Sequence, residues 1–321
     1  MRTIPALGLC MMLWLVLPPA GRGQTPVFNI NQFSSSSDLA LLGDAAISGA
    51  RVRLTPARAG RVGGTTFSTK RYVQAGFETT FAFQISGAGG GGGEGLAFVI
   101  HNNALPALGL PGASIGYGGL PGSLAVEFDT RQNSANDAPA NHISVHARGT
   151  PTAALTNSAD NSASLGMVTN GLPDFADGNI HTARIVYAPG SLAIFVDGAA
   201  TPALTVPVDH STRMSLERCQ AWCGFTAAKG AGYQVHEIVA WSFFTAATPV
   251  TVDITTPLDG ASFVAPAIVH LTAAASASNS TVARVEYFQG SRRLGQATNS
   301  PYAFSWESVA PGSYLIVAVA T

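Results

Sequence analysis

The sequence predicts an all-β protein built from two β-sandwich domains. Glycine and proline are frequent, at 35 and 19 of 321 residues, and they divide the chain into short segments. Within these segments apolar and polar residues alternate, which is the period of strands with one buried face. No long segment shows the periodicity of an amphipathic helix. Short alternating strands separated by turn residues are typical of β-sandwiches.

Composition supports this fold class and excludes some partners. Hydrophobic residues make up 46% of the chain and charged residues only 11%, so apolar surface is sufficient for a core. A length of 321 residues is that of roughly two domains. The net charge of −1 gives no electrostatic reason to expect nucleic acid or an acidic membrane surface as a partner.

The N-terminus has the pattern of a signal peptide. Arg2 is followed by an apolar run over residues 4–17 and then by a segment rich in Pro and small residues. This run is too short for a comfortable transmembrane helix. We predict a signal peptide over residues 1–23, although cleavage after Ala20 also fits. No other apolar stretch is long enough to span a bilayer, so we expect a secreted protein, extracellular or at the cell surface.

Two cysteines are left once the signal peptide is removed, and both are close in sequence. Cys219 and Cys223 are an even number of thiols in an oxidising compartment, so we predict a disulfide between them. The alternative is two separately buried thiols. A zinc site is not expected, because no second Cys or His pair has zinc spacing nearby.

The strand pattern can be followed along the chain as far as a seam near residue 245. Strands are predicted over residues 77–85, 95–100, 182–187 and 192–196, and a hairpin turn at Asp197-Gly198 closes the last of them. After Phe244 the composition shifts to Thr, Ala and Pro. We therefore place the first domain at 24–245, a linker at 246–256 and a second domain at 250–321.

One predicted strand, residues 124–129, holds two carboxylates. Side chains alternate across a strand, so Glu127 and Asp129 lie on the same face. A loop rich in Asn and Asp follows, and a second strand returns at His142. This path brings together five polar residues: Glu127, Asp129, Asn133, Asp137 and His142. Neighbouring carboxylates repel unless they are protonated or neutralised.

A bound cation resolves this conflict. Oxygen ligands from Asp, Asn and backbone carbonyls suit Ca²⁺, whereas an added imidazole suits a transition ion such as Mn²⁺. The alternative from residue types alone is a solvated strand edge with an Asx-rich turn.

At these residues the sequence resembles the legume-type (L-type) lectins. Residues 124–130, LAVEFDT, match that family's metal-binding strand, with the Asn, Asp and His at compatible spacings. Other segments resemble the family in the same order: residues 28–33, 41–47, 94–98, 224–228 and 236–243. The likeness covers roughly residues 26–244. It implies a concanavalin-like jelly-roll sandwich that binds carbohydrate without catalysing a reaction.

The resemblance also implies roles for the metal-binding residues. Glu127 and His142 would bind the transition ion, Mn²⁺ above all. Asp129 and Asp137 would bridge the two ions. Asn133 and the Arg131 carbonyl would complete the Ca²⁺ site.

By the same resemblance, a sugar site lies beside the calcium. Its implied residues are Glu94, Gly118, Gly119, Arg131, Asn133, Ala228, Lys229 and Gly230. Two of them depart from the family pattern: Glu94 replaces an Asp, and Arg131 replaces a stacking aromatic. Tyr117 and Tyr233 are other aromatics nearby, for which ordinary packing is the alternative. Glycans are the expected partners, and a homo-oligomer is left open.

A glycoside hydrolase of related architecture is the rival hypothesis. Such enzymes carry E-x-D-x-x-E or E-x-D-x-E on one strand, because hydrolysis uses two carboxylates across the scissile bond. Here Glu127-x-Asp129 is followed by Thr, Arg, Gln and Asn, so the second glutamate is missing. We therefore expect no enzymatic activity.

The C-terminal part resembles bacterial immunoglobulin-like repeats. The resemblance lies in residues 252–263, 285–288, 301–306 and 311–320. One further strand is expected after residue 320, so we predict a small Ig-like sandwich that is incomplete in this sequence. Such a domain acts as a spacer, and a cell-surface adhesion or scaffold protein is therefore the alternative function.

Overall fold

The computed structural model describes residues 28–35, 37–103, 105–134, 137–150, 155–217, 219–245, 250–277, 281–290 and 292–320. The predicted signal peptide, residues 1–23, lies outside the described residues. The chain divides into two compact units, with the division at residues 246–247.

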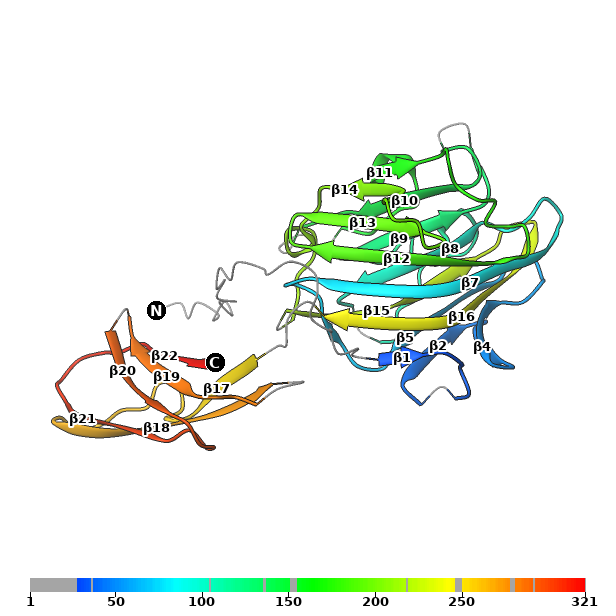
Figure 1. Ribbon diagram of the computed structural model, residues 1–321. Coiled ribbons are helices and arrows are strands. Elements are labelled where there is room, and N and C mark those ends of the chain that lie inside the picture. Colours follow the sequence, from blue (N-terminus) through cyan, green and yellow to red (C-terminus); the bar gives the residue numbers. More distant parts are fainter. Residues whose placement is uncertain are drawn as a thin grey trace. The chain divides into compact units, whose positions relative to one another are not determined.

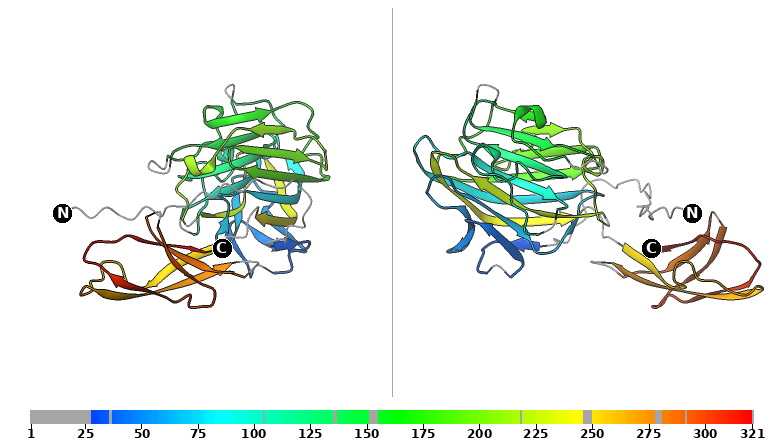
Figure 2. Two further views of the ribbon diagram at one scale, coloured as in Figure 1. Left: turned by 60° about the vertical axis from the view of Figure 1, so that its left-hand side comes forward. Right: turned by 180° about the vertical axis from the view of Figure 1, so that it is seen from behind.

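The first unit is a sandwich of two antiparallel sheets, each with eight strands in the described residues (Figures 1 and 2). In one sheet the order is β14-β13-β12-β7-β16-β4-β3, and β1 pairs with β16. Its strands are β1 (Phe28–Ile30), β3 (Ala46–Ser48), β4 (Arg51–Thr55), β7 (Phe77–Gly89), β12 (Ile180–Ala188), β13 (Ser191–Val196), β14 (Leu204–Val206) and β16 (Tyr233–Thr245). The strands predicted over residues 77–85, 95–100, 182–187 and 192–196 are present as β7, β8 (Gly95–His101), β12 and β13.

In the other sheet the order is β11-β10-β9-β8-β15-β5-β2, and β6 pairs with β15. Its strands are β2 (Leu39–Gly43), β5 (Val62–Phe67), β6 (Arg71–Tyr72), β8 (Gly95–His101), β9 (Ser123–Asp129), β10 (His142–Ala147), β11 (Ser164–Val168) and β15 (Gln220–Ala228). Short 3-10 helices lie at η1 (Gly112–Ser114), η2 (Asn161–Ala163) and η3 (His210–Thr212).

Aromatic rings from both sheets fill the space between them. Burial along β7 alternates residue by residue, so its phenylalanines enter the core at every second position. Phe81 of β7 lies 4.8 Å from Phe225 of β15 and 5.8 Å from Phe128 of β9, between ring centroids. Complete burial of a phenylalanine side chain contributes about 1.5–3 kcal/mol to the free energy of folding. The inner face of β9 is therefore anchored by Phe128.

The outer face of β8 and β9 is covered as well. Ile115, Tyr117 and Leu120, from the segment after η1, form a second small core with Ala97, Val99 and Ala125. Every residue of β8, β9 and β10 is buried as a result. Glu127 and Asp129 thus lie inside the protein, not on the solvated strand edge that residue types alone left open.

The predicted disulfide between Cys219 and Cys223 is wrong. Cys223 is a free thiol on β15, fully buried in the main core. Cys219 lies in the turn before that strand. Gln220, Ala221 and Trp222 of β15 lie between Cys219 and Cys223. An extended chain advances about 3.3 Å per residue, so the Cα atoms of the two cysteines are expected to lie roughly 10 Å apart or more. A disulfide needs a Cα separation below about 7 Å.

The second unit is a smaller pair of three-stranded sheets, with orders β17-β18-β21 and β20-β19-β22. The strands are β17 (Val250–Thr256), β18 (Ala267–Ala277), β19 (Val285–Gln289), β20 (Arg292–Ala297), β21 (Phe304–Val309) and β22 (Ile316–Ala320). Leu271, Val285 and Tyr287 are fully buried between the sheets. Residues 250–256 of the predicted linker are β17, and residues 246–249 lie outside the described residues.

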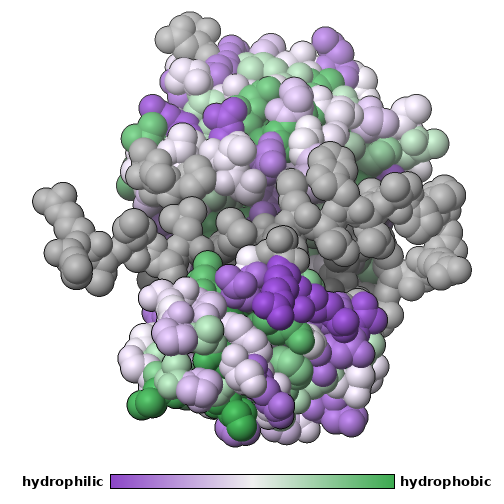
Figure 3. Space-filling view, turned by 90° about the vertical axis from the view of Figure 1, so that its left-hand side faces the viewer, coloured by the Kyte–Doolittle hydropathy of each residue, from purple (hydrophilic) through white to green (hydrophobic). Residues whose placement is uncertain are grey.

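Several apolar side chains of the second unit are exposed. Val264, Leu258 and Leu315 are 91%, 78% and 79% exposed, and Figure 3 shows hydrophobic residues at the surface of this unit beside strongly hydrophilic ones. In the part of the chain that is described, no helix is long and apolar enough to cross a membrane.

Candidate functional site

The pairing of β9 with β10 places three of the predicted metal ligands, Glu127, Asp129 and His142, on one face. His142 lies opposite Asp129, and Ser144 lies opposite Glu127. The core face of the same strands carries Val126 and Phe128, so a shift by one residue would bury the charges in the aromatic core. The alternation of side chains along β9 therefore determines which residues line the site.

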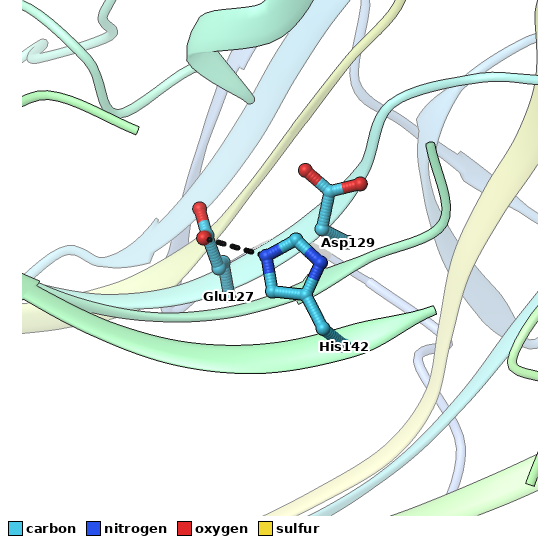
Figure 4. A group of neighbouring side chains, drawn as sticks. All are labelled: Glu127, Asp129 and His142. Atoms are coloured by element: carbon cyan, nitrogen blue, oxygen red, sulfur yellow. Dashed lines mark ion pairs between the residues drawn. The ribbon is translucent and has the colours of Figure 1, made fainter. Parts of the chain in front are cut away.

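Glu127, Asp129 and His142 form a compact buried cluster (Figure 4). One ligand atom from each lies within 4.8 Å of the others. His142 Nε2 is 3.4 Å from Glu127 Oε1, and His142 Nδ1 is 2.9 Å from the carbonyl oxygen of Pro139. If Nδ1–H donates to that carbonyl, Nε2 is left as a lone pair facing the two carboxylates. His142 Nε2 has no hydrogen-bond partner, as expected of a metal ligand.

Glu127 is held in its charged form. Its Oε2 accepts a 2.6 Å hydrogen bond from the Tyr117 hydroxyl, and its Oε1 lies 2.8 Å from His146 Nε2. Burial alone would raise the pKa of Glu127, but the two imidazoles and the Tyr117 hydroxyl lower it to about 2. Burial also lowers the pKa of His142, and the contact with Glu127 more than reverses this, so that the net pKa is raised.

Asp129 is in the opposite electrostatic situation. Burial, followed by the charge of Glu127, raises its pKa well above the ordinary value, although its Oδ1 accepts a 2.6 Å hydrogen bond from the Arg131 amide. A carboxylate buried beside another carboxylate is destabilised until a cation neutralises it. Two carboxylates and one imidazole are ligands that suit a divalent transition ion. The residues present therefore fit such an ion.

The loop after β9 brings the other predicted ligands near, but not into, the cluster. Asp137 accepts from the Asn133 amide at 2.8 Å through Oδ2 and from the Ala138 amide at 2.9 Å through Oδ1. Both carboxylate oxygens of Asp137 thus order the loop, and Asp137 does not belong to the compact cluster. Asn133 is exposed. Residues 135–136 between them lie outside the described residues.

Glu94 lies beside this loop and is 2% exposed. Its Oε1 accepts a 2.9 Å hydrogen bond from the Gly230 amide, which ties the loop after β15 to the segment before β8. Its Oε2 has no hydrogen-bond partner and lies 3.9 Å from Arg131 Nε. Glu94 and Arg131 are therefore brought together as a loose ion pair.

Other predicted sugar-site residues are already engaged by the protein. The Gly118 and Gly119 amides donate to the carbonyl oxygens of Ser114 and Asn157, both at 2.9 Å. Neither amide is offered to a ligand in this arrangement. The Lys229 side chain turns inward, where Nζ donates to the Pro56 carbonyl oxygen. Burial lowers the pKa of Lys229 to about 8.

The remaining predicted residues have clear places. Ala228 is buried at the end of β15, and its carbonyl oxygen accepts from the Glu94 amide at 3.4 Å. Tyr117 is fully buried with its hydroxyl on Glu127, so it is not a stacking platform for a sugar. Tyr233, at the start of β16, is 38% exposed.

Comparison with known proteins agrees with this geometry. The description "Legume lectin domain" matches residues 25–259, and "Bacterial Ig domain" matches residues 251–318. The chain belongs to the legume lectin family. Its C-terminal part is a bacterial Ig domain, and the predicted jelly-roll and Ig-like folds are both confirmed.

Relatives of this legume lectin domain include plant proteins. Agglutinin-2 of Cladrastis kentukea is 27% identical over 278 residues, covering 75% of this chain and 88% of the agglutinin. The probable L-type lectin-domain containing receptor kinase S.5 of Arabidopsis thaliana is 29% identical over 141 residues, 37% of this chain and 22% of the kinase.

Solved structures of legume lectins have the same fold. The Bauhinia forficata lectin, in complex with GalNAc, has a TM-score of 0.57 at 25% identity and matches 69% of this chain and 98% of its own. Peanut lectin, with a 9mer peptide, has a TM-score of 0.56 at 25% identity and matches 67% and 95%.

Sequence reasoning missed the role of two residues in this legume lectin domain. His146 lies on the same face of β10 as His142, and alternation along the strand could have indicated it. Tyr117 contacts Glu127 because its loop covers β9, and no local sequence pattern predicts how that loop folds.

Proposed function

We propose that this protein is a secreted, Ca²⁺-dependent carbohydrate-binding protein without catalytic activity. The observation that carries the proposal is the buried cluster of Glu127, Asp129 and His142. Membership of the legume lectin family supports it. The cluster has ligands for a cation, and Glu94 stands at the edge of the adjoining loops.

In this proposal the ion site has two halves. Glu127 and His142 hold the transition ion, Mn²⁺ in the first instance. Asp129 and Asp137 would hold both this ion and Ca²⁺, and the Asp137 carboxylate would turn from the loop amides to do so. Asn133 and the Arg131 carbonyl complete the calcium ligands. Oxygen-rich ligation of this kind is what Ca²⁺ prefers.

The glycan binds next to the calcium half. Glu94 and Asn133 supply an acceptor and an amide whose directions are fixed by the ion-ordered loop. Glu94 Oε2 and Arg131 Nη1 have no hydrogen-bond partner but are buried, so in this proposal the surrounding loops must move before glycan hydroxyl groups reach them. The loop of Ala228, Lys229 and Gly230 forms one side of the sugar site. The Lys229 side chain stabilises this loop through its bond to the Pro56 carbonyl oxygen and does not contact the glycan.

The arrangement of the carboxylates supports a non-catalytic role. Glu127 and Asp129 are both buried, and the two oxygens of Glu127 contact Tyr117 and His146. Hydrolysis of a glycosidic bond instead needs two carboxyl groups that reach the substrate from opposite sides.

A cell-surface adhesion scaffold with a vestigial sugar site is the second candidate. It is favoured by the Gly118 and Gly119 amides, which are bonded within the protein, and by the Ig domain, which can act as a spacer. In both cases residues 1–23 direct export and are removed.

Measuring bound ions tests the proposal. Purified full-length protein, dialysed after exposure to Ca²⁺ and Mn²⁺, is expected to retain both ions in elemental analysis. Asp129→Ala should retain neither, and Asp253→Ala, in the Ig domain, is a control that should retain both. Wild-type protein that keeps no ion would contradict the proposed site.

A further inference from the structure

Glu127 is contacted by two groups that do not belong to the ion cluster. The Tyr117 hydroxyl donates to Oε2 at 2.6 Å, and His146 Nε2 lies 2.8 Å from Oε1. Tyr117 and His146 are both fully buried, and their rings pack 6.0 Å apart between centroids. Each oxygen of Glu127 therefore has a neighbour capable of donating a hydrogen bond.

Strand geometry explains why two imidazoles reach the same carboxylate. His142, Ser144 and His146 share a face of β10, and Ser144 is directly opposite Glu127. Serine is small, and its hydroxyl lies 2.8 Å from that of Ser164 on β11, away from Glu127. The two histidines therefore lean towards Glu127 from either side of Ser144, at 3.4 and 2.8 Å from Oε1.

The two histidines are not equivalent. His142 groups with Glu127 and Asp129 as a potential ion ligand, whereas His146 does not join that group. His142 is oriented through Pro139. His146 lies at hydrogen-bond distance from Glu127, although not at a hydrogen-bond angle, and neither of its ring nitrogens has a hydrogen-bond partner. Buried polar side chains normally have hydrogen-bond partners, so a buried histidine without any indicates a specific role.

We propose that His146, assisted by Tyr117, is a positioning residue for the transition ion: it holds Glu127 from outside the cluster so that one Oε1 lone pair faces the ion. The inference rests on the proposed ion site. Groups that hydrogen-bond to metal-binding carboxylates and fix their orientation usually change metal affinity about 10–100-fold when they are removed. His146 acts on Glu127, which belongs to the transition-ion half, so Mn²⁺ should be affected more than Ca²⁺.

The test compares two substitutions of different chemistry. His146→Leu removes the donor and keeps the bulk, whereas His146→Gln keeps an N–H near the position of Nε2. Tyr117→Phe removes the second donor alone. His101→Leu is the matched control, because His101 is also buried, also has unpartnered ring nitrogens, and lies on β8 away from the ion cluster. Mn²⁺ and Ca²⁺ affinities are measured by calorimetry on the full-length variants, each with the other ion present in excess.

Mn²⁺ affinity should fall about 10–100-fold in His146→Leu and recover substantially in His146→Gln. Ca²⁺ affinity should change less, and His101→Leu should keep wild-type affinity for both ions. Because a purely structural role would not discriminate between the ions, the ratio of the two affinities decides the question.

Equal Mn²⁺ affinity in wild type and His146→Leu would overturn the inference while leaving the ion site intact. Pulsed EPR that finds two imidazoles coordinated to Mn²⁺ would also overturn it, since His146 would then be a ligand. A wild-type protein that binds no Mn²⁺ would instead reject the proposed function on which the inference rests.

Discussion

His236 should make the lectin domain sensitive to mild acid. It is fully buried on β16, where Nδ1 lies 2.7 Å from the Thr55 hydroxyl and Nε2 has no partner. Burial, and secondarily the charge of Lys229, lower the pKa of His236 from 6.5 to about 3. The folded protein therefore keeps the ring neutral at pH values where the unfolded chain takes up a proton.

The size of the effect follows from linkage. Between the unfolded and folded pKa values the unfolded chain binds more protons, so stability rises with pH and is lost as pH falls below 6.5. At about pH 5 this imidazole is protonated in the unfolded chain but still neutral in the folded protein, where its pKa is about 3. The free energy of unfolding is therefore lower by about 2 kcal/mol than at neutral pH, from this one side chain.

The assay is the free energy of unfolding of the lectin domain by denaturant, at about pH 7.5 and about pH 5, with ions in constant excess. His236→Gln should lose about 2 kcal/mol less than wild type over this interval. His270→Gln, at an exposed position in the Ig domain, should lose as much as wild type. An identical loss in wild type and His236→Gln would refute the assignment of a neutral buried imidazole.

Three further outcomes are expected. Asp129→Ala should remove both ions and with them about 2.7 kcal/mol of stability per ion, at an ion excess of a hundredfold over the dissociation constant, whereas His142→Ala should spare Ca²⁺ more than Mn²⁺; loss of Mn²⁺ alone in Asp129→Ala would contradict its bridging role. In Gly230→Ala the new Cβ would lie 2.6 Å from Glu94 Oε1 and displace the bond from the Gly230 amide, so the melting temperature should fall, by about 1.5–3 kcal/mol of stability, and glycan binding should weaken with it. Cys223 should react with a thiol reagent in unreduced protein only after denaturation, and its failure to react there would show that it is paired.

Strands of the first domain were predictable because their alternation is local. Four of the five inward positions of β7 are apolar, with Thr79 as the exception, and the same alternation put Glu127 and Asp129 on one face. That both faces of β9 are covered was not predictable, because the covering residues, Ile115 to Leu120, come from an irregular segment without a period. This covering segment is what makes Glu127 and Asp129 buried and not solvated.

The wrong disulfide prediction and two other differences between sequence and structure have physical causes. Proximity in sequence suggested a bond between Cys219 and Cys223, but an extended strand separates residues that a turn would bring together. The linker was read from Thr and Pro content, although Val250, Val252 and Ile254 alternate as β17 requires. The Gly118 and Gly119 amides depend on hydrogen bonds to Ser114 and Asn157 that only the folded chain reveals.

Ion-dependent glycan binding can be measured on a glycan array probed with the full-length protein in Ca²⁺ and Mn²⁺, and again after EDTA. The proposed function predicts glycan binding that disappears with the ions and is also lost in Asn133→Ala. Binding that survives complete removal of the ions would contradict the proposed site. Retention of both ions without binding to any glycan would contradict the lectin function and favour the adhesion scaffold.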